Sequence, residues 1–120
     1  MKICCGTDII EINRVKEAIE RTEGFKTRVF SEKEIEYCES KKVQKYQHYA
    51  ARFAAKEAAF KALSKVINIP NVIWKDIEVV KLESGRPELK IKGIDLENID
   101  LSLSHCKEYA VANVVILYNE

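Results

Sequence analysis

The sequence contains little glycine and proline, with four glycines and two prolines among 120 residues. Collagen-like and low-complexity chains depend on a high content of these residues and are therefore excluded. No internal repeat and no linker of biased composition divides the chain. At this length the size distribution of domains favours one unit, so we expect a single domain that spans residues 1–120.

Long apolar runs are also missing. The longest uncharged run, from Tyr109 to Asn119, is much shorter than the roughly 20 residues that cross a bilayer. The segment Met1–Glu11 lacks the apolar centre of a signal peptide. The four cysteines match neither the spacing of a paired zinc site nor a dense disulfide framework. We therefore expect a cytoplasmic protein with reduced thiols and no membrane contact.

An excess of one charge is absent as well. Lys and Arg number 20 and Asp and Glu number 19, which gives a net charge of +1. A domain that binds nucleic acid over a wide face needs a stronger positive balance, so we expect no nucleic-acid partner. The sequence does contain a 47% apolar fraction, which suffices for a folded core. Any binding of anions must therefore come from local clusters of cations.

The first half of the sequence carries clear strand and helix signals. β-Branched residues predict a strand over Ile3–Ile12. Asn13 is expected to cap the helix that follows, and Gly24 is expected to terminate it. Ser31 and Glu34 have the spacing of a capping box, which predicts a second helix that begins at Ser31.

A break near Ser40 precedes the longest predicted helix, from about Lys42 to Val66, in which apolar residues recur at helical spacing. The rest of the chain has the alternation and turn residues of β-strands. The expected strands are Ile73–Leu82, Leu89–Lys92, Leu101–Cys106 and Tyr109–Tyr118, and Ser84–Pro87 is the expected turn between the first two. A helical middle and a mostly antiparallel sheet predict the α+β class, with the long central helix packed on the sheet.

Glu57 is the most informative residue of the long helix. At about 100° per residue it falls within the apolar stripe that includes Phe53 and Phe60. A carboxylate at such a position needs an ion pair, a hydrogen bond or a metal. Lys61 lies one turn later, so a structural ion pair is one interpretation. The other is a metal ligand beside a phosphate-binding lysine.

Asp8 interrupts the apolar run of the first strand and has similar alternatives. Alone it suits a turn or a structural pair. Asp8 and Glu57 together suit magnesium, which takes one or two carboxylates along with phosphate oxygens and water. His105 ends a strand and is either a satisfied core histidine or a site residue. Arg86 lies in a rigid turn that suits either solvent or contact with a phosphate or an adenine ring.

Five blocks of the sequence resemble the holo-acyl-carrier-protein synthases, the small 4′-phosphopantetheinyl transferases. In chain order, the blocks are Gly6–Ile12, Arg28–Glu34, Phe53–Ala58, Gly85–Pro87 and Ser102–His105. The resemblance implies the 4′-phosphopantetheinyl transferase-like fold, with one domain per chain and homotrimers whose active sites lie at subunit clefts. It also implies magnesium-dependent transfer of 4′-phosphopantetheine from coenzyme A to a serine of apo acyl carrier protein. That reaction releases adenosine 3′,5′-bisphosphate and makes holo carrier protein for fatty acid biosynthesis.

The same resemblance implies roles for individual residues. Asp8 and Glu57 would hold magnesium, and the catalytic residues would be Glu57, Lys61 and His105. The residues implied in coenzyme A binding are Lys45, Arg52, Lys56, Lys61, Gly85, Arg86, Pro87 and His105. The carrier protein would dock on Arg14, Arg21 and Arg28. Either His105 or Lys61 could protonate the leaving phosphate.

The chain departs from the family pattern in two places. Cys106 stands where many relatives have threonine, and a thiol is a weaker hydrogen-bond donor. The basic cluster expected for the 3′-phosphate is thin around Lys45, and Lys41 and Lys42 are alternatives to it. Two other functions compete with the transferase: a binding module for a nucleotide or coenzyme A, and a magnesium-dependent phosphohydrolase.

Overall fold

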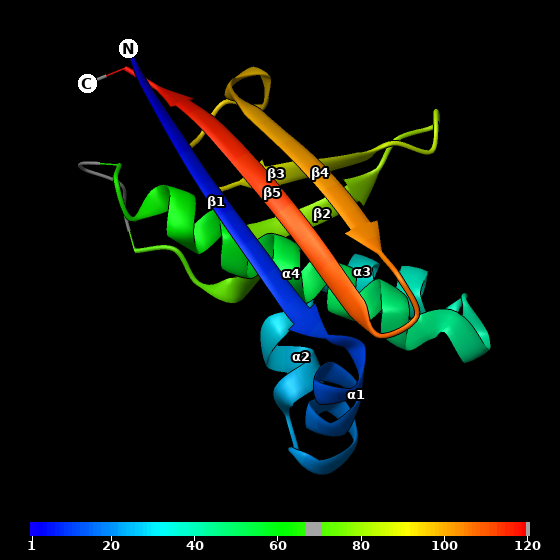
Figure 1. The fold of residues 1–120 in the computed structure, drawn as a ribbon. Helices are drawn as coiled ribbons and strands as arrows, with labels where there is room; N and C mark the ends of the chain where they lie inside the picture. The colour runs from blue at the N-terminus through cyan, green and yellow to red at the C-terminus, as the bar shows by residue number, and fades with distance from the viewer. Residues whose placement is uncertain (67–70, 120) are drawn as a thin grey trace.

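Two antiparallel β-sheets and one long helix make up most of the structure (Figure 1). It is a computed structural model, and its described residues are 1–66 and 71–119. The strands are β1 (Lys2–Glu11), β2 (Ile77–Lys81), β3 (Pro87–Ile91), β4 (Ile99–His105) and β5 (Tyr109–Tyr118). The helices are α1 (Ile12–Arg21), α2 (Phe25–Val29), α3 (Glu32–Glu39) and α4 (Lys45–Leu63). Short 3₁₀ turns cover Lys42–Gln44, Trp74–Asp76 and Leu96–Asn98.

The strands form two sheets, with the orders β1-β5-β4 and β2-β3. Helix α4 packs against β1 and β5, and Figure 1 shows it running behind the first sheet. The expected α+β class, with antiparallel strands and a long central helix, is therefore confirmed. One expectation needs correction, because the strands divide between two sheets and do not join in one.

The capping box at the start of α3 is present. The side-chain oxygen of Ser31 accepts a hydrogen bond from the backbone N–H of Glu34, at 3.2 Å. The backbone N–H of Ser31 donates in return to Glu34 Oε1, at 2.9 Å. The helix that begins here ends at Glu39, close to the expected break at Ser40. Local spacing sufficed for this element because both partners lie within one helical turn.

The region before α3 differs from expectation. Helix α1 begins at Ile12 without a side-chain cap, so Asn13 lies inside the helix and does not cap it. The helix ends at Arg21, before Gly24. Gly24 adopts a left-handed conformation (φ 81°) and precedes α2, a helix of five residues that the sequence pattern did not reveal. Five residues are too few to show a helical period.

Close contact between β1 and α4 depends on small residues. Ala54, Ala58 and Ala62 of α4 are fully buried in the core beneath the first sheet. A Cβ atom added at Gly6 of β1 would lie 1.9 Å from the carbonyl oxygen of Ala58. The strand backbone therefore rests directly on the helix backbone. This contact fixes where the next inward-facing residue of β1, Asp8, meets the helix.

The contact at Gly6 leads to a stability prediction. We expect Gly6→Ala to lower the free energy of unfolding by more than about 2 kcal/mol, because the added methyl group meets helix backbone and not a movable side chain. Urea denaturation followed by circular dichroism measures the change. Cys5→Ala is the matched control, since Cys5 is exposed on the opposite face of β1. Equal stability of Gly6→Ala and the parent protein would contradict the packing described.

The outer face of the first sheet is apolar and open. Ile3 is 70% exposed, Ile9 62% and Val115 39%. Between them Thr7 donates a hydrogen bond to Asn113 Oδ1 across β1 and β5. Exposed patches of this kind on a sheet commonly mark an interaction surface. Among the helices that the structure describes, none has the length and apolar content needed to cross a membrane.

Candidate functional site

A carboxylate and a lysine meet where β1 passes α4. Lys61 Nζ lies 3.2 Å from Asp8 Oδ1 and donates to the carbonyl oxygen of Thr7, at 2.8 Å. Glu57 precedes Lys61 by one turn of α4. Among the described residues, the ion pair of Lys61 is with Asp8 and not with Glu57. We call Asp8, Glu57 and Lys61 the carboxylate site.

The electrostatics of the carboxylate site favour a bound cation. Partial burial raises the pKa of Glu57, the negative charge of Asp8 raises it further, and Lys61 opposes both. The two carboxylates are thus close enough to repel each other. Asp8 Oδ2 is buried and has no hydrogen-bond partner within the described part of the chain. A cation between the carboxylates would relieve the repulsion and satisfy this oxygen.

The donor set fits magnesium. Residues 1–66 and 71–119 contain no group of three or more His, Cys, Asp and Glu side chains arranged to hold a metal. A metal that needs three or four protein ligands is therefore a poor match for Asp8 and Glu57. Magnesium is commonly bound through one or two carboxylates, with the remaining ligands supplied by substrate phosphates and water.

A second group of charged residues gathers around Tyr37 of α3. The Arg52 guanidinium carbon lies 4.2 Å from the centre of the Tyr37 ring, Lys41 Nζ 4.8 Å and Lys81 Nζ 5.4 Å. His48 meets the same ring edge-on, with ring centres 5.5 Å apart. We call Tyr37, Lys41, His48, Arg52 and Lys81 the cation cluster. No carboxylate of the described residues forms an ion pair with its three cations.

The cation cluster carries an uncompensated positive field. Burial lowers the pKa of His48 to about 4, and the charges of Arg52, Lys41, His105 and Lys81 contribute. Partial burial alone would raise the pKa of Tyr37, but a hydrogen bond from Lys81 and the nearby cations outweigh it and lower that pKa. The buried Nε of Arg52 has no partner among the described residues. An anion such as a phosphate would complement this group.

Two lysines implied in coenzyme A binding are engaged elsewhere. Lys45 forms an ion pair with Glu39 at 3.2 Å, and this hydrogen bond raises the pKa of Lys45. Of the alternatives to Lys45, Lys41 joins the cation cluster, and Lys42 begins the 3₁₀ turn Lys42–Gln44. Lys56 is 0% exposed and pairs with buried Glu34 at 2.8 Å. Direct contact between Lys56 and coenzyme A therefore does not fit this structure.

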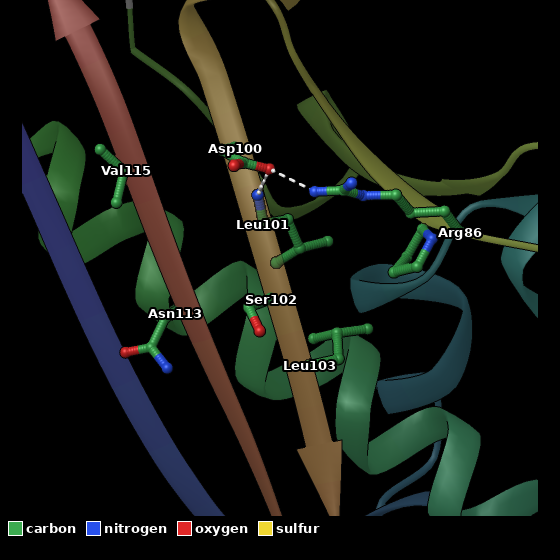
Figure 2. Close-up of a pocket in the computed structure, with 8 residues that line it drawn as sticks. Arg86, Asp100, Leu101, Ser102, Leu103, Asn113 and Val115 are labelled. Carbon is green, nitrogen blue, oxygen red and sulfur yellow. Dashed lines mark hydrogen bonds and ion pairs between the residues drawn. The ribbon is translucent and has the colours of Figure 1, made fainter.

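A pocket of about 330 Å³ lies at the edge strand β4. Figure 2 shows Arg86 on one side of β4 and Asn113 and Val115 on the other. Arg86 follows Gly85, which is left-handed (φ 87°), and its guanidinium lies 3.4 Å from Asp100 Oδ1. Pro87 and Leu101–Leu103 complete the lining. The turn implied in coenzyme A binding thus borders an open pocket, but not at the carboxylate site.

His105 lies on the side of the cation cluster. The register of the first sheet aligns Asp8 with Ala112 and Ala112 with Leu103. His105 is two residues further along β4 and two strands from Asp8, which together correspond to about 12 Å. Its charge helps to lower the pKa of His48. His105 is exposed and so is not a satisfied core histidine.

The carboxylate site and the cation cluster face different directions. Arg52 and Glu57 are five residues apart on α4, which corresponds to a rotation of about 140° around the helix axis. Within one chain, the implied site residues therefore do not all lie around one point. The three arginines implied in docking are exposed on α1 and α2, at the far end of β1: Arg14, Arg21 and Arg28.

Sequence reasoning missed Tyr37, His48 and Lys81. Tyr37 and Lys81 are 44 residues apart, so no local spacing links them. Their side chains meet because α3 packs against β2. The only local signal was the position of His48 one turn before Arg52 on the long helix.

Comparisons with known proteins agree with this architecture. A family model described as the 4′-phosphopantetheinyl transferase superfamily matches residues 4–114. A holo-[acyl-carrier-protein] synthase from Ruminiclostridium cellulolyticum is 46% identical over 125 residues, covering 97% of this chain and 92% of that protein.

Solved structures show the same relationship. A Chronobacterium ammoniagenes ACPS-CoA complex matches with a TM-score of 0.84 at 28% identity, over 100% of both chains. A holo-(acyl-carrier-protein) synthase from Bacillus anthracis in complex with CoA (3′,5′-ADP) matches with a TM-score of 0.78 at 36% identity, over 94% of each chain. The similarity thus covers nearly the whole chain in sequence and in fold.

Proposed function

The chain belongs to the 4′-phosphopantetheinyl transferase superfamily, and from this membership we propose that it moves 4′-phosphopantetheine from coenzyme A to a serine of apo acyl carrier protein. Adenosine 3′,5′-bisphosphate is the other product, and the holo carrier protein serves fatty acid biosynthesis. The observation that carries the proposal is the carboxylate site, where two carboxylates meet a lysine and where Asp8 Oδ2 is buried with no partner among the described residues.

The proposed chemistry follows from the charges of the site. Asp8 and Glu57 would hold magnesium, which as a Lewis acid stabilises negative charge on the diphosphate when bound. Lys61, one turn of α4 after Glu57, neutralises the charge of a phosphate oxygen. In the metal-free chain, burial and Asp8 raise the pKa of Glu57, and a bound cation would oppose both effects and keep Glu57 as the carboxylate that can accept a proton. Glu57 therefore takes the proton of the attacking serine, and His105 or Lys61 protonates the leaving phosphate.

The cation cluster is the proposed site for the 3′-phosphate of coenzyme A. Its three cations are unpaired among the described residues, and a phosphate monoester offers the charge and the acceptors that they lack. Arg52 supplies a planar group whose buried Nε has no partner in the described part of the chain. Arg86 and Pro87 border the pocket of Figure 2, which suits the adenosine end.

A homotrimer is the proposed assembly. The apolar outer face that includes Ile3, Ile9 and Val115 is open in one chain and suits coverage by neighbouring copies. A cleft between copies would also bring the carboxylate site of one subunit to the cation cluster and His105 of the next. The separation of these groups within one chain supports a shared site.

Transfer is tested directly by mass spectrometry. Incubation with coenzyme A, magnesium and apo carrier protein is expected to add one phosphopantetheine to the carrier protein and to release adenosine 3′,5′-bisphosphate. Apo carrier protein with its serine changed to alanine is the control and should gain nothing. Release of the nucleotide without any carrier protein would favour a phosphohydrolase. Binding of coenzyme A without either product would favour a binding module.

The exposed arginines lead to a prediction for the carrier protein. Arg14 and Arg21 lie two turns apart on α1, and exposed ion pairs act mainly on encounter and are screened by salt. We expect Arg14→Glu, Arg21→Glu or Arg28→Glu to raise the KM for carrier protein about threefold to tenfold and to leave the KM for coenzyme A unchanged. Steady-state kinetics at several salt concentrations measure both constants.

The control for docking is Lys92→Glu, which reverses an exposed charge beyond β3, outside α1 and α2. It is expected to leave both KM values unchanged. The KM of the parent for carrier protein should climb with ionic strength, and less steeply in the arginine variants. If charge reversal at the arginines weakened coenzyme A and spared the carrier protein, the docking surface would be misassigned.

A further inference from the structure

The buried ion pair of Glu34 and Lys56 is fully satisfied. Both side chains are 0% exposed, and Lys56 Nζ lies 2.8 Å from Glu34 Oε1. Glu34 Oε1 also accepts the backbone N–H of Ser31, and Glu34 Oε2 accepts that of Val79, each at 2.9 Å. The carboxylate of α3 therefore binds the start of its own helix, strand β2 and helix α4 at once.

The lysine of the pair makes equally specific contacts. Lys56 Nζ donates to the carbonyl oxygen of Trp74 at 3.0 Å and to that of Ile77. With Glu34 these acceptors account for all three of its N–H groups. The ion pair thus joins α3, α4 and the segment 74–79 through hydrogen bonds of fixed direction.

Each residue of the ion pair lies one helical turn from a member of the cation cluster. Tyr37 follows Glu34 by three residues on α3, and Arg52 precedes Lys56 by four residues on α4. Residues three or four apart on a helix lie on the same face. A shift of either helix at the ion pair would therefore move Tyr37 relative to Arg52, whose guanidinium rests on its ring.

Strand β2, which donates to Glu34 at Val79, also carries a member of the cation cluster. Lys81 follows Val79 by two residues on β2, and residues two apart on a strand point to the same side. Lys81 reaches the Tyr37 hydroxyl at 3.4 Å. The three elements that carry the ring and two of its cations are thus the three elements that the ion pair joins.

Stability alone is a poor reason for such a pair. Replacing a buried ion pair with apolar residues of similar volume is often neutral or stabilising, whereas the directional contacts are lost. The directions of the hydrogen bonds are what a purely apolar contact could not reproduce. What the pair supplies is a fixed relative position of α3, α4 and β2.

We propose that Glu34 and Lys56 are positioning residues that set the spacing of the cation cluster and thereby the recognition of the 3′-phosphate of coenzyme A. Neither side chain touches the ligand. The part that concerns the ligand rests on the function proposed for the cluster. The part that concerns spacing does not, because Tyr37 reports on it without any ligand.

The double variant Glu34→Met/Lys56→Met tests the proposal, since methionine has a similar length and needs no partner. The pKa of Tyr37, measured by NMR of ¹³C-labelled tyrosine and assigned with Tyr37→Phe, is expected to rise as the cations move away. The affinity for coenzyme A is expected to fall about tenfold, and the affinity for dephospho-coenzyme A to stay unchanged, because it lacks the 3′-phosphate. Calorimetric titration measures both affinities.

Controls separate positioning from folding. Ile116→Val removes a buried methylene from β5 and lowers stability, and it should move neither the Tyr37 pKa nor the preference for coenzyme A. If the double variant does not fold, Glu34→Gln keeps the shape of the side chain and removes its charge, and the same two readouts apply. An unchanged Tyr37 pKa and an unchanged ligand preference in a folded variant would overturn the proposal and leave the pair purely structural.

Lys81→Met separates the role of the cation cluster from the role of the ion pair. If this variant loses the preference for coenzyme A and the double variant does not, positioning is wrong and the phosphate site stands. If Lys81→Met keeps the preference, the cluster does not bind the 3′-phosphate. The Tyr37 pKa of the double variant then still decides whether the ion pair sets the spacing.

Discussion

Replacing Glu57 with glutamine is expected to slow phosphopantetheine transfer about a thousandfold, and Asp8→Asn is expected to do nearly the same. Each change keeps the size of the side chain and removes its negative charge. Both variants lose a proposed magnesium ligand, and Glu57→Gln also loses the proposed base for the serine proton. Initial rates at saturating magnesium and coenzyme A measure the effect, and chelation of divalent ions should abolish the activity of the parent.

Glu57→Gln is expected to lower activity without lowering the stability of the fold. Its pKa in the folded protein lies above its usual range because burial and Asp8 disfavour the charged form. The folded state therefore binds more protons than the unfolded state between the two pKa values, and its stability falls as pH rises through that window. Glu57→Gln removes this penalty. We expect thermal denaturation at neutral pH to show a variant at least as stable as the parent.

The pH profile offers a further check on the same residue. Activity of the parent should rise with pH as the Glu57 carboxyl, the proposed base, loses its proton. Glu83→Gln, which changes an exposed carboxylate, is the matched control and should retain full activity. Near-parent turnover of Glu57→Gln at saturating magnesium would remove Glu57 from the proposed mechanism.

Mixing two inactive variants is expected to restore activity if the site is shared between subunits. Glu57→Gln removes a carboxylate from the carboxylate site, and His105→Ala removes the histidine that lies near the cation cluster. In a random mixed trimer, about one quarter of the clefts would combine an intact carboxylate site from one copy with an intact His105 from the next. A recovery from about a thousandth of the parent activity to about a quarter is therefore expected.

The mixing experiment requires exchange of subunits, which joint refolding or coexpression provides. Each variant taken alone through the same procedure is the control and should stay inactive. Light scattering should report three chains for the parent and for the mixture. If proven mixed trimers showed no recovery, both groups would act within one chain and the shared cleft would be wrong.

Several features were predictable because they are local. The capping box at Ser31 and Glu34 lies within one turn, and the structure contains both of its hydrogen bonds. The strand that contains Asp8 and the helix that contains Glu57 were also expected, since period and composition reveal such elements. The family followed from short motifs that are contiguous in the chain.

The depth of burial around α4 was harder to predict. Phe53 and Phe60 suggested the buried stripe, and they are only half-buried, beside Trp74. The alanines face the sheet, because close approach of a strand such as β1 at Gly6 requires small side chains. Lys56 therefore became the fully buried charge, whereas Glu57 stayed partly exposed.

The sequence by itself determined the first strand, the helix after Ser31, the long helix, the α+β class and the motif residues of the carboxylate site. Only the tertiary structure decided that Tyr37 and Lys81, 44 residues apart, share one cluster, and that Lys56 pairs with Glu34 and not with a ligand. The reason is that a helical or strand period fixes the face on which a side chain lies. Which distant element covers that face depends on how α3, α4 and β2 pack together.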